Sequence, residues 1–210
     1  MPVGRLHVLT DFVFQQRFSN ADLATLAARG GADTVQFRHK VATLRARLHE
    51  AEQTAAACHA AGVPLLVNDD PALALAVGAA GVHLGQLDLP VAVARRILGP
   101  NAVVGATVTN AAQARDAEAA GASYLGFGPV FPTQSKRNPA SVKGLDGLAA
   151  ACAAVSIPVI GIAGITPEHV ASVLDAGAHG VAVMTAVTTA DDPEAATAAF
   201  RREIDRATDG

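Results

Sequence analysis

The chain has 210 residues, 50% of them hydrophobic, which is enough to bury one good core. Its formal net charge is -3, so no strong basic surface for nucleic acid is expected, and no apolar run is as long as a membrane span. The sequence therefore predicts a cytoplasmic protein with a single domain over residues 1–210, in which any bound anion is held by local groups.

Short apolar runs alternate with Ala-rich helical stretches along the whole chain. Several helical stretches end in glycine, as at Gly62 and Gly121, and an apolar run follows directly. The runs are nearly continuous, which is typical of parallel strands covered on both faces. Strands are predicted at 5–10, 33–38, 63–68, 81–85, 102–107, 123–128, 158–162 and 179–184, each followed by a helix. Eight alternating units favour an α/β fold, a single (β/α)8 TIM barrel with a parallel eight-stranded core, over an open doubly wound sheet.

The second predicted strand carries polar side chains at every other position. Gln36, Arg38 and Lys40 share one face, because successive side chains of a strand point to opposite sides. A barrel strand has no solvated edge, and two cations stacked near the lumen repel each other unless an anion joins them. The pattern therefore favours an anion site over a solvated face.

Acidic side chains follow the third and fourth strands. Asp70 precedes Pro71, which is typical of a helix N-cap. Asp69 and Asp88 close adjacent strands, so they can face each other across the barrel mouth beside the cations. Two carboxylates supplemented by phosphate oxygens form a usual protein site for Mg2+. From these residues alone, helix capping is an equally good interpretation.

The later strands end in polar or glycine-containing segments. After strand six, the connection from residue 128 to 143 is long and includes Lys136, and long loops at this end of a barrel are usually functional. Glycines after strand seven let backbone N–H groups approach a phosphate. His83, inside strand four, is interpreted as a packed histidine with no chemical role. No serine lies in a nucleophile elbow and neither cysteine lies at a strand end, so covalent catalysis is not indicated.

Several of these segments, in this order, resemble the motifs of the thiamine phosphate synthase family. The likeness begins at Leu9-Thr10-Asp11 and extends through the eighth strand. The motifs are Val35-Gln36-Phe37-Arg38-His39-Lys40, Asn68-Asp69, His83-Leu84-Gly85-Gln86-Leu87-Asp88, Gly128-Pro129-Val130-Phe131-Pro132-Thr133-Gln134-Ser135-Lys136 and Val183-Met184-Thr185-Ala186. Several dispersed motifs in one order are far more specific than any single one.

The resemblance implies a transferase of thiamine biosynthesis that condenses hydroxymethylpyrimidine diphosphate with thiazole phosphate and releases pyrophosphate, through a dissociative, Mg2+-assisted reaction. It implies pyrophosphate contacts from Gln36, Arg38, Lys40, Asn68, Thr107 and Lys136, and Mg2+ bound by Asp69 and Asp88. It implies that Arg38, Lys40, Thr107 and Lys136 are catalytic. It further implies that Thr133 and Ser135 contact the thiazole phosphate, that Gly164 and Thr185 lie at the phosphate-binding ends of strands seven and eight, and that Met184 contacts substrate.

The sequence departs from the family motifs at four places. His39 replaces a usual glutamate, Thr107 a usual serine, Ser135 a usual threonine, and Ala163 one glycine of a usual pair. Strand alternation turns His39 away from the predicted anion site, and Ser135 keeps the hydroxyl. The Ala163 methyl narrows the expected phosphate pocket, so these changes bear on affinity more than on reaction type.

Two alternatives share the barrel. A related thiazole tautomerase would not couple two substrates, and a non-catalytic barrel would only bind thiamine phosphates. Neither requires a carboxylate pair beside an anion cradle, so the residues favour the synthase. The expected partners are small-molecule substrates, with no nucleic acid or membrane. A homo-oligomer is compatible with the sequence, which leaves the oligomeric state open.

Overall fold

The structure, a computed structural model, describes residues 3–133, 135 and 141–208. Within this part of the chain, helices alternate with eight strands. The strands are β1 (Leu6–Leu9), β2 (Thr34–Phe37), β3 (Leu65–Asn68), β4 (Gly81–Leu84), β5 (Val103–Val108), β6 (Tyr124–Phe127), β7 (Val159–Ile162) and β8 (Gly180–Val183). All eight predicted strands are present, and each end lies within two residues of its predicted position.

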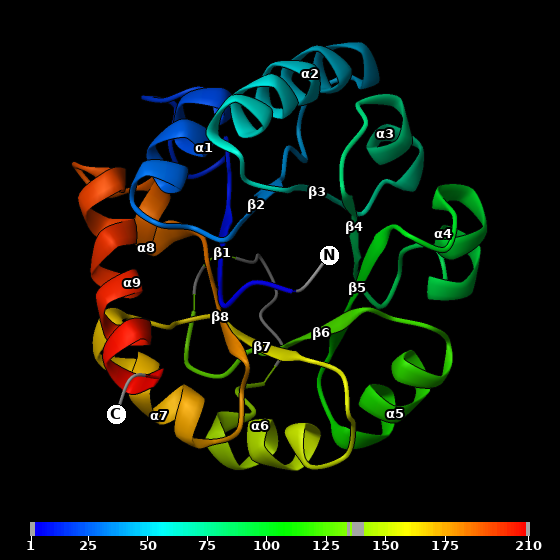
Figure 1. The fold of residues 1–210 in the computed structure, drawn as a ribbon, viewed down its shortest axis with the longest axis vertical. Helices are drawn as coiled ribbons and strands as arrows, with labels where there is room; N and C mark the ends of the chain where they lie inside the picture. The colour runs from blue at the N-terminus through cyan, green and yellow to red at the C-terminus, as the bar shows by residue number, and fades with distance from the viewer. Residues whose placement is uncertain (1–2, 134, 136–140, 209–210) are drawn as a thin grey trace.

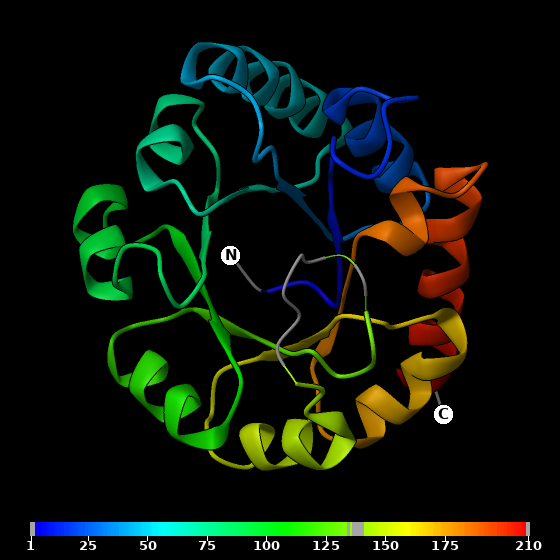
Figure 2. The same ribbon diagram turned by 180° about the vertical axis from the view of Figure 1, so that it is seen from behind.

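The strands form a closed parallel barrel. Each strand pairs with its neighbours in chain order, and β1 also pairs with β8, so the sheet has no free edge. Figure 1 shows the strands at the centre with helices around them, and Figure 2 shows the same ring from the opposite end. The prediction of a single (β/α)8 barrel is confirmed, and the open doubly wound sheet is excluded.

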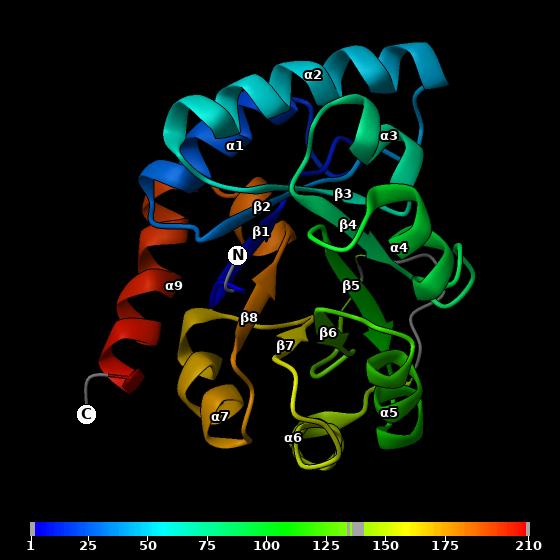
Figure 3. The ribbon, with the colours of Figure 1, turned by 45° about the vertical axis from the view of Figure 1, so that its right-hand side comes forward.

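The helices form the outer layer of the barrel. They are α1 (Asn20–Arg29), α2 (Leu44–Ala61), α3 (Pro71–Ala76), α4 (Val91–Leu98), α5 (Ala111–Ala119), α6 (Gly144–Cys152), the 3-10 turn η1 (Pro167–His169), α7 (Val170–Asp175), α8 (Thr185–Thr188) and α9 (Pro193–Thr208). The long helix α2 lies against α1 (Figure 3). In the residues that the structure describes, no helix combines the length and apolar character needed to cross a membrane.

Helix starts follow the local sequence. The Asp70 side chain accepts a hydrogen bond from the Leu73 N–H at 2.9 Å, directly before Pro71, so the predicted N-cap is confirmed. Ser19 and Asp22 form a capping box at the start of α1. These caps fix the residues at which the loops before α1 and α3 end.

Alternation along the strands separates two packed layers. On β2, Val35 and Phe37 pack outward into the layer between strands and helices, whereas Gln36 points into the barrel. The interior has its own apolar layer, formed by Leu9, Leu66, Tyr124, Ile160 and Ala182. The space above this layer, at the carboxyl ends of the strands, is lined by polar and apolar side chains together.

Candidate active site

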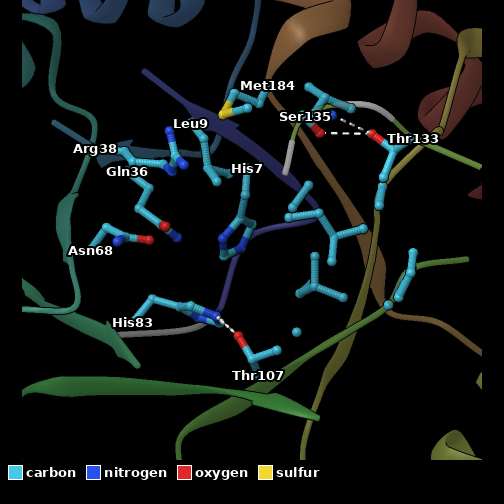
Figure 4. A pocket seen from close by; sticks show the side chains of 18 of the residues that line it. His7, Leu9, Gln36, Arg38, Asn68, His83, Thr107, Thr133, Ser135 and Met184 are labelled. Carbon is cyan, nitrogen blue, oxygen red and sulfur yellow. Dashed lines mark hydrogen bonds between the residues drawn. The ribbon is translucent and has the colours of Figure 1, made fainter. Parts of the chain in front are cut away.

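One cavity of about 840 Å³ opens at the carboxyl ends of the strands and extends into the lumen. It brings together twelve of the predicted site residues from separate strands and loops. They are Gln36, Arg38, Lys40, Asn68, Asp69, Asp88, Thr107, Thr133, Ser135, Gly164, Met184 and Thr185. In Figure 4, Gln36, Arg38 and Asn68 lie along one wall, and Thr133 and Ser135 lie across the cavity. The remaining predicted residue, Lys136, lies outside the described residues.

The two cations that follow β2 have carboxylate partners. Arg38 donates from Nη1 to Asp11 Oδ1, and the Lys40 Nζ lies 2.9 Å from Asp69 Oδ2. Protein carboxylates therefore already neutralise both cations, and the predicted anion site beside them stays a prediction. His39 turns away from the cavity, as alternation predicts, and stacks on Phe12 with ring centroids 5.2 Å apart.

The two predicted metal ligands lie side by side at the mouth. Burial raises the pKa of the Asp88 carboxyl, and its hydrogen bond to Asp69 and the Asp69 charge raise it further; the Gly85 N–H and Lys40 oppose the rise. Asp69 has φ of 69°, a left-handed conformation that non-glycine residues adopt mainly at functional or strained positions. Two carboxylates held this close repel unless a proton or a cation lies between them. Their arrangement fits a divalent cation.

The described residues contain no group of three or more His, Cys, Asp or Glu side chains able to hold a metal. A cation at this mouth would therefore have two protein carboxylates and take its other ligands from substrate or water. Mg2+ commonly binds in this way, with one or two carboxylates plus phosphate oxygens. The carboxylate pair thus fits a metal that arrives with a phosphorylated substrate.

The far wall carries hydroxyl groups and tightly packed backbone. Thr133 Oγ1 and Ser135 Oγ lie 2.7 Å apart in a hydrogen bond. Gly164 has φ of 69°, and a Cβ there would lie 2.5 Å from the Pro132 carbonyl oxygen. Ala163 also has a positive φ of 83°, although it is not glycine. The loops after β6 and β7 therefore approach each other closely beside the hydroxyl pair.

The cavity floor contains polar residues that motif analysis did not assign. His83 Nδ1 lies 2.8 Å from the Tyr124 hydroxyl, and His83 Nε2 lies 2.9 Å from Thr107 Oγ1. His7 is buried beside them, and its Nε2 lies 3.1 Å from the Gly4 carbonyl oxygen. Burial lowers the pKa of His7 to about 4, so its ring is neutral near pH 7.

Asp11 was also missed as a site residue. It is fully buried and forms an ion pair with Arg38. Its only signal in the sequence is its place in the family-like motif Leu9-Thr10-Asp11. His7 and His83 could have been predicted, because the alternation of side chains along their strands points both toward the lumen. Asp11 lies two residues beyond the end of β1, and no pattern in the sequence pointed to its partner, Arg38.

Fold and cavity together define the class: a (β/α)8-barrel protein whose mouth combines cations, a carboxylate pair and hydroxyl groups suited to phosphorylated ligands. The family model described as thiamine monophosphate synthase (TMP-TENI) matches residues 9–187. The chain belongs to this family.

Individual relatives agree with the family match. The chain is 58% identical over 203 residues to the thiamine-phosphate synthase of Salinibacter ruber, covering 97% of this chain and 89% of the relative. It is 49% identical over 181 residues to that of Natronomonas pharaonis, covering 85% of each chain. A solved thiamine phosphate pyrophosphorylase from Pyrococcus furiosus superimposes with a TM-score of 0.87 at 35% identity, covering 97% of this chain and 96% of that one.

Proposed function

We propose that the protein is a thiamine-phosphate synthase that joins hydroxymethylpyrimidine diphosphate to thiazole phosphate and releases pyrophosphate. The observation that carries the proposal is the single cavity that gathers two cations, a carboxylate pair and a hydroxyl pair on facing walls. Two phosphorylated substrates need two anion-binding regions within reach of each other, and this cavity offers both. The family membership and the named relatives support the same reaction.

The depth of the Gln36 side chain favours contact with the pyrimidine ring. Gln36 is 3% exposed, and its Oε1 has no hydrogen-bond partner among the described residues. A buried amide oxygen without a partner is costly, and an exocyclic amino group of a pyrimidine would satisfy it. The apolar side chains of Leu9 and Ile160 line the same space and would cover the ring. In this proposal Gln36 and Asn68 orient the pyrimidine below its diphosphate, a role that differs from the pyrophosphate contacts implied by the resemblance.

The diphosphate would lie above the ring, beside Arg38 and Lys40. Asp69 and Asp88 would hold Mg2+ there, and the ion would supply positive charge to neutralise the leaving diphosphate. Arg38 is held by Asp11 through one nitrogen, so other N–H groups of its guanidinium remain for phosphate oxygens. These groups favour the transition state most, because negative charge accumulates on the diphosphate as its bond to carbon breaks.

The proposed reaction is dissociative. The carbon–oxygen bond to the diphosphate breaks with its electron pair going to oxygen, and the thiazole ring nitrogen then donates its lone pair to the pyrimidine-bearing carbon. No proton has to move in either step, so neither an acid–base pair nor a protein nucleophile is required. The lumen walls, which include Leu9 and Ile160, would limit access of water to the reactive carbon.

The thiazole phosphate would bind across the cavity. The hydroxyls of Thr133 and Ser135 offer donors, and Gly164 and Thr185 line the same end of the cavity. Backbone N–H groups at glycine-containing loops after the seventh and eighth strands are a common phosphate site in this fold. The second substrate would then lie opposite Arg38, as an attack on the carbon that loses diphosphate demands.

The test is formation of thiamine phosphate and pyrophosphate from the two purified substrates, with Mg2+ and with a chelator. We expect coupling that depends on Mg2+ and falls by on the order of 10²-fold or more in Asp69→Ala and in Lys136→Ala. Asp116→Asn is the matched control, because this carboxylate lies on α5 away from the cavity and its loss should leave the rate unchanged.

The alternatives predict different results. A thiazole tautomerase would isomerise the thiazole substrate without consuming the pyrimidine diphosphate. A non-catalytic barrel would bind thiamine phosphate tightly and form neither product. Folded wild-type protein that gives either result would overturn the proposed synthase.

A further inference from the structure

A chain of hydrogen bonds crosses the floor of the cavity, from β6 through β4 to β5. The Tyr124 hydroxyl lies 2.8 Å from His83 Nδ1, and His83 Nε2 lies 2.9 Å from Thr107 Oγ1. Figure 4 shows the His83 ring directed at the Thr107 hydroxyl. Tyr124 is 2% exposed, and Thr107 lines the same cavity as Arg38 and Lys40. The chain thus begins in the interior apolar layer and ends at a hydroxyl that lines the cavity.

The direction of donation along this chain follows from Tyr124. A buried hydroxyl proton needs an acceptor, and His83 is the only hydrogen-bond partner of this hydroxyl among the described residues. Burial raises the pKa of Tyr124, so the phenol keeps its proton and donates to His83 Nδ1. With Nδ1 as acceptor, the ring proton must be on Nε2, which donates to Thr107 Oγ1. Thr107 accepts that bond and keeps its own proton for another acceptor.

The barrel makes room for this chain with two glycines. A Cβ at Gly105 would lie 2.3 Å from the Tyr124 ring carbon Cζ and 2.6 Å from His83 Nδ1. A Cβ at Gly126 would lie 2.9 Å from His83 Cε1. Neither glycine has a positive φ, so space, and not backbone conformation, excludes a side chain there. The rings of His83 and Tyr124 therefore fit because β5 and β6 have glycine, and no side chain, at positions 105 and 126.

We propose that Tyr124 and His83 are positioning residues that hold the Thr107 hydroxyl as a donor toward the diphosphate of the pyrimidine substrate. This inference rests on the proposed function. The diphosphate oxygens act as acceptors, so Thr107 can bind them only as a donor. If the Thr107 hydroxyl could also donate its one proton to His83, it would be available to the diphosphate for only part of the time. A donor fixed in advance needs no reorientation when negative charge develops on the leaving group.

The experiment compares two replacements of His83 that each keep one end of the chain. Glutamine has its amide at the position of Nε2 and can still donate to Thr107, whereas asparagine is shorter and can reach only Tyr124. We expect Thr107→Val and His83→Asn to lower kcat by on the order of 10²-fold, and His83→Gln to retain kcat within about 10-fold of wild type. His83→Asn combined with Thr107→Val should be no slower than Thr107→Val alone.

Two further measurements keep the test decisive. Circular dichroism establishes folding, and if His83→Asn does not fold, Tyr124→Phe replaces it with an expected loss in kcat of about 10-fold. Calorimetric titration with inorganic pyrophosphate and Mg2+ should show weaker binding in Thr107→Val. Equal kcat values for the glutamine and asparagine variants, or additive losses in the double variant, would overturn the positioning role. An inactive wild type would instead overturn the proposed function.

Discussion

Asp11 is a buried carboxylate placed against a cation that the proposed reaction needs. Its Oδ2 accepts hydrogen bonds from the N–H groups of Val13 and Phe14, both at 2.7 Å, while its Oδ1 accepts from Arg38. The backbone N–H of Arg38 donates to Thr10 Oγ1 at 3.2 Å. The end of β1 therefore fixes both the backbone and the guanidinium of Arg38. A guanidinium held at one edge presents its other edge in a defined direction.

Replacement of the Asp11 carboxylate should leave the Arg38 guanidinium less firmly held. In Asp11→Asn, the single amide oxygen can serve either Arg38 or the two backbone N–H groups, and we expect kcat to fall by about 10-fold, or roughly 1.4 kcal/mol. The KM for thiazole phosphate should stay unchanged, because Thr133 and Ser135 lie across the cavity. Steady-state kinetics with each substrate varied in turn provides the measurement. An equal change in both KM values would point to a general loss of structure instead.

His7 should make stability depend on pH. Burial lowers its pKa from 6.5 to about 4, so the folded protein binds a proton at this ring less readily than the unfolded chain does. The stabilisation is present above pH 6.5 and is lost as the pH falls toward 4; it amounts to on the order of 3 kcal/mol. His7→Gln can keep the bond to the Gly4 carbonyl without titrating. Urea unfolding at several pH values should give a shallower slope for this variant, whereas parallel curves would refute the assignment.

At the scale of elements, the connection after β6 is held against the connection after β7. The N–H groups of Val130 and Phe131 donate to the carbonyls of Ile162 and Ala163, at 3.0 and 3.1 Å. The Phe131 ring stacks on His169 with centroids 4.0 Å apart. Thr133 and Ser135 follow on the same connection. The position of the hydroxyl pair therefore depends on how closely the two connections pack.

Gly164 tests that dependence. In Gly164→Ala, the positive φ would cost about 1 kcal/mol of stability, and the new methyl would also push on Pro132 and Phe131. We expect the KM for thiazole phosphate to rise by on the order of 10-fold, since a shift near 1 Å displaces the hydroxyl pair. Gly78→Ala is the matched control: its φ is +63° and its Cβ would meet open space, so stability should fall without a change in KM. Identical KM values in the two variants would contradict the proposed packing effect.

The elements were predictable because their signals are local and repeated. Apolar runs, glycine C-caps and caps such as Asp70 depend on adjacent residues, so all eight strands were found. Gln36, Arg38 and Lys40 were placed together because the alternation of β2 continues through the residues that directly follow it. The pairing of Asp11 with Arg38 was not predicted, because it joins residues 27 positions apart through side-chain torsions. The chain from Tyr124 to Thr107 likewise depends on strand register, which the sequence pattern leaves undetermined.

At the scale of the whole molecule, the two ends of the barrel have different roles. The carboxyl ends of the strands line the cavity, whereas the opposite end contains a clasp around Asp33. Asp33 Oδ2 accepts from the N–H groups of Arg5 and Leu6, both at 2.8 Å, and from Arg201 Nη1 at 3.0 Å. This single carboxylate joins the start of β1, the start of β2 and the last helix, α9. In barrels, residues at this end contribute to stability and those at the other end to function.

Asp33→Ala should therefore separate stability from activity. We expect a loss of about 1–3 kcal/mol in the free energy of unfolding, because two backbone N–H groups and one guanidinium lose their acceptor. The kcat of the folded variant should stay within about 2-fold of wild type, because the clasp lies at the far end of the barrel from the proposed site. Asp205→Ala is the control: it removes the exposed second partner of Arg201 and should change stability by less than about 0.5 kcal/mol. Chemical denaturation gives the free energy of unfolding, and steady-state kinetics on the same samples gives kcat. A large fall in kcat in fully folded Asp33→Ala would mean that changes at the end of the barrel that contains Asp33 reach the cavity at the other end. The two ends would then not have separate roles in stability and activity.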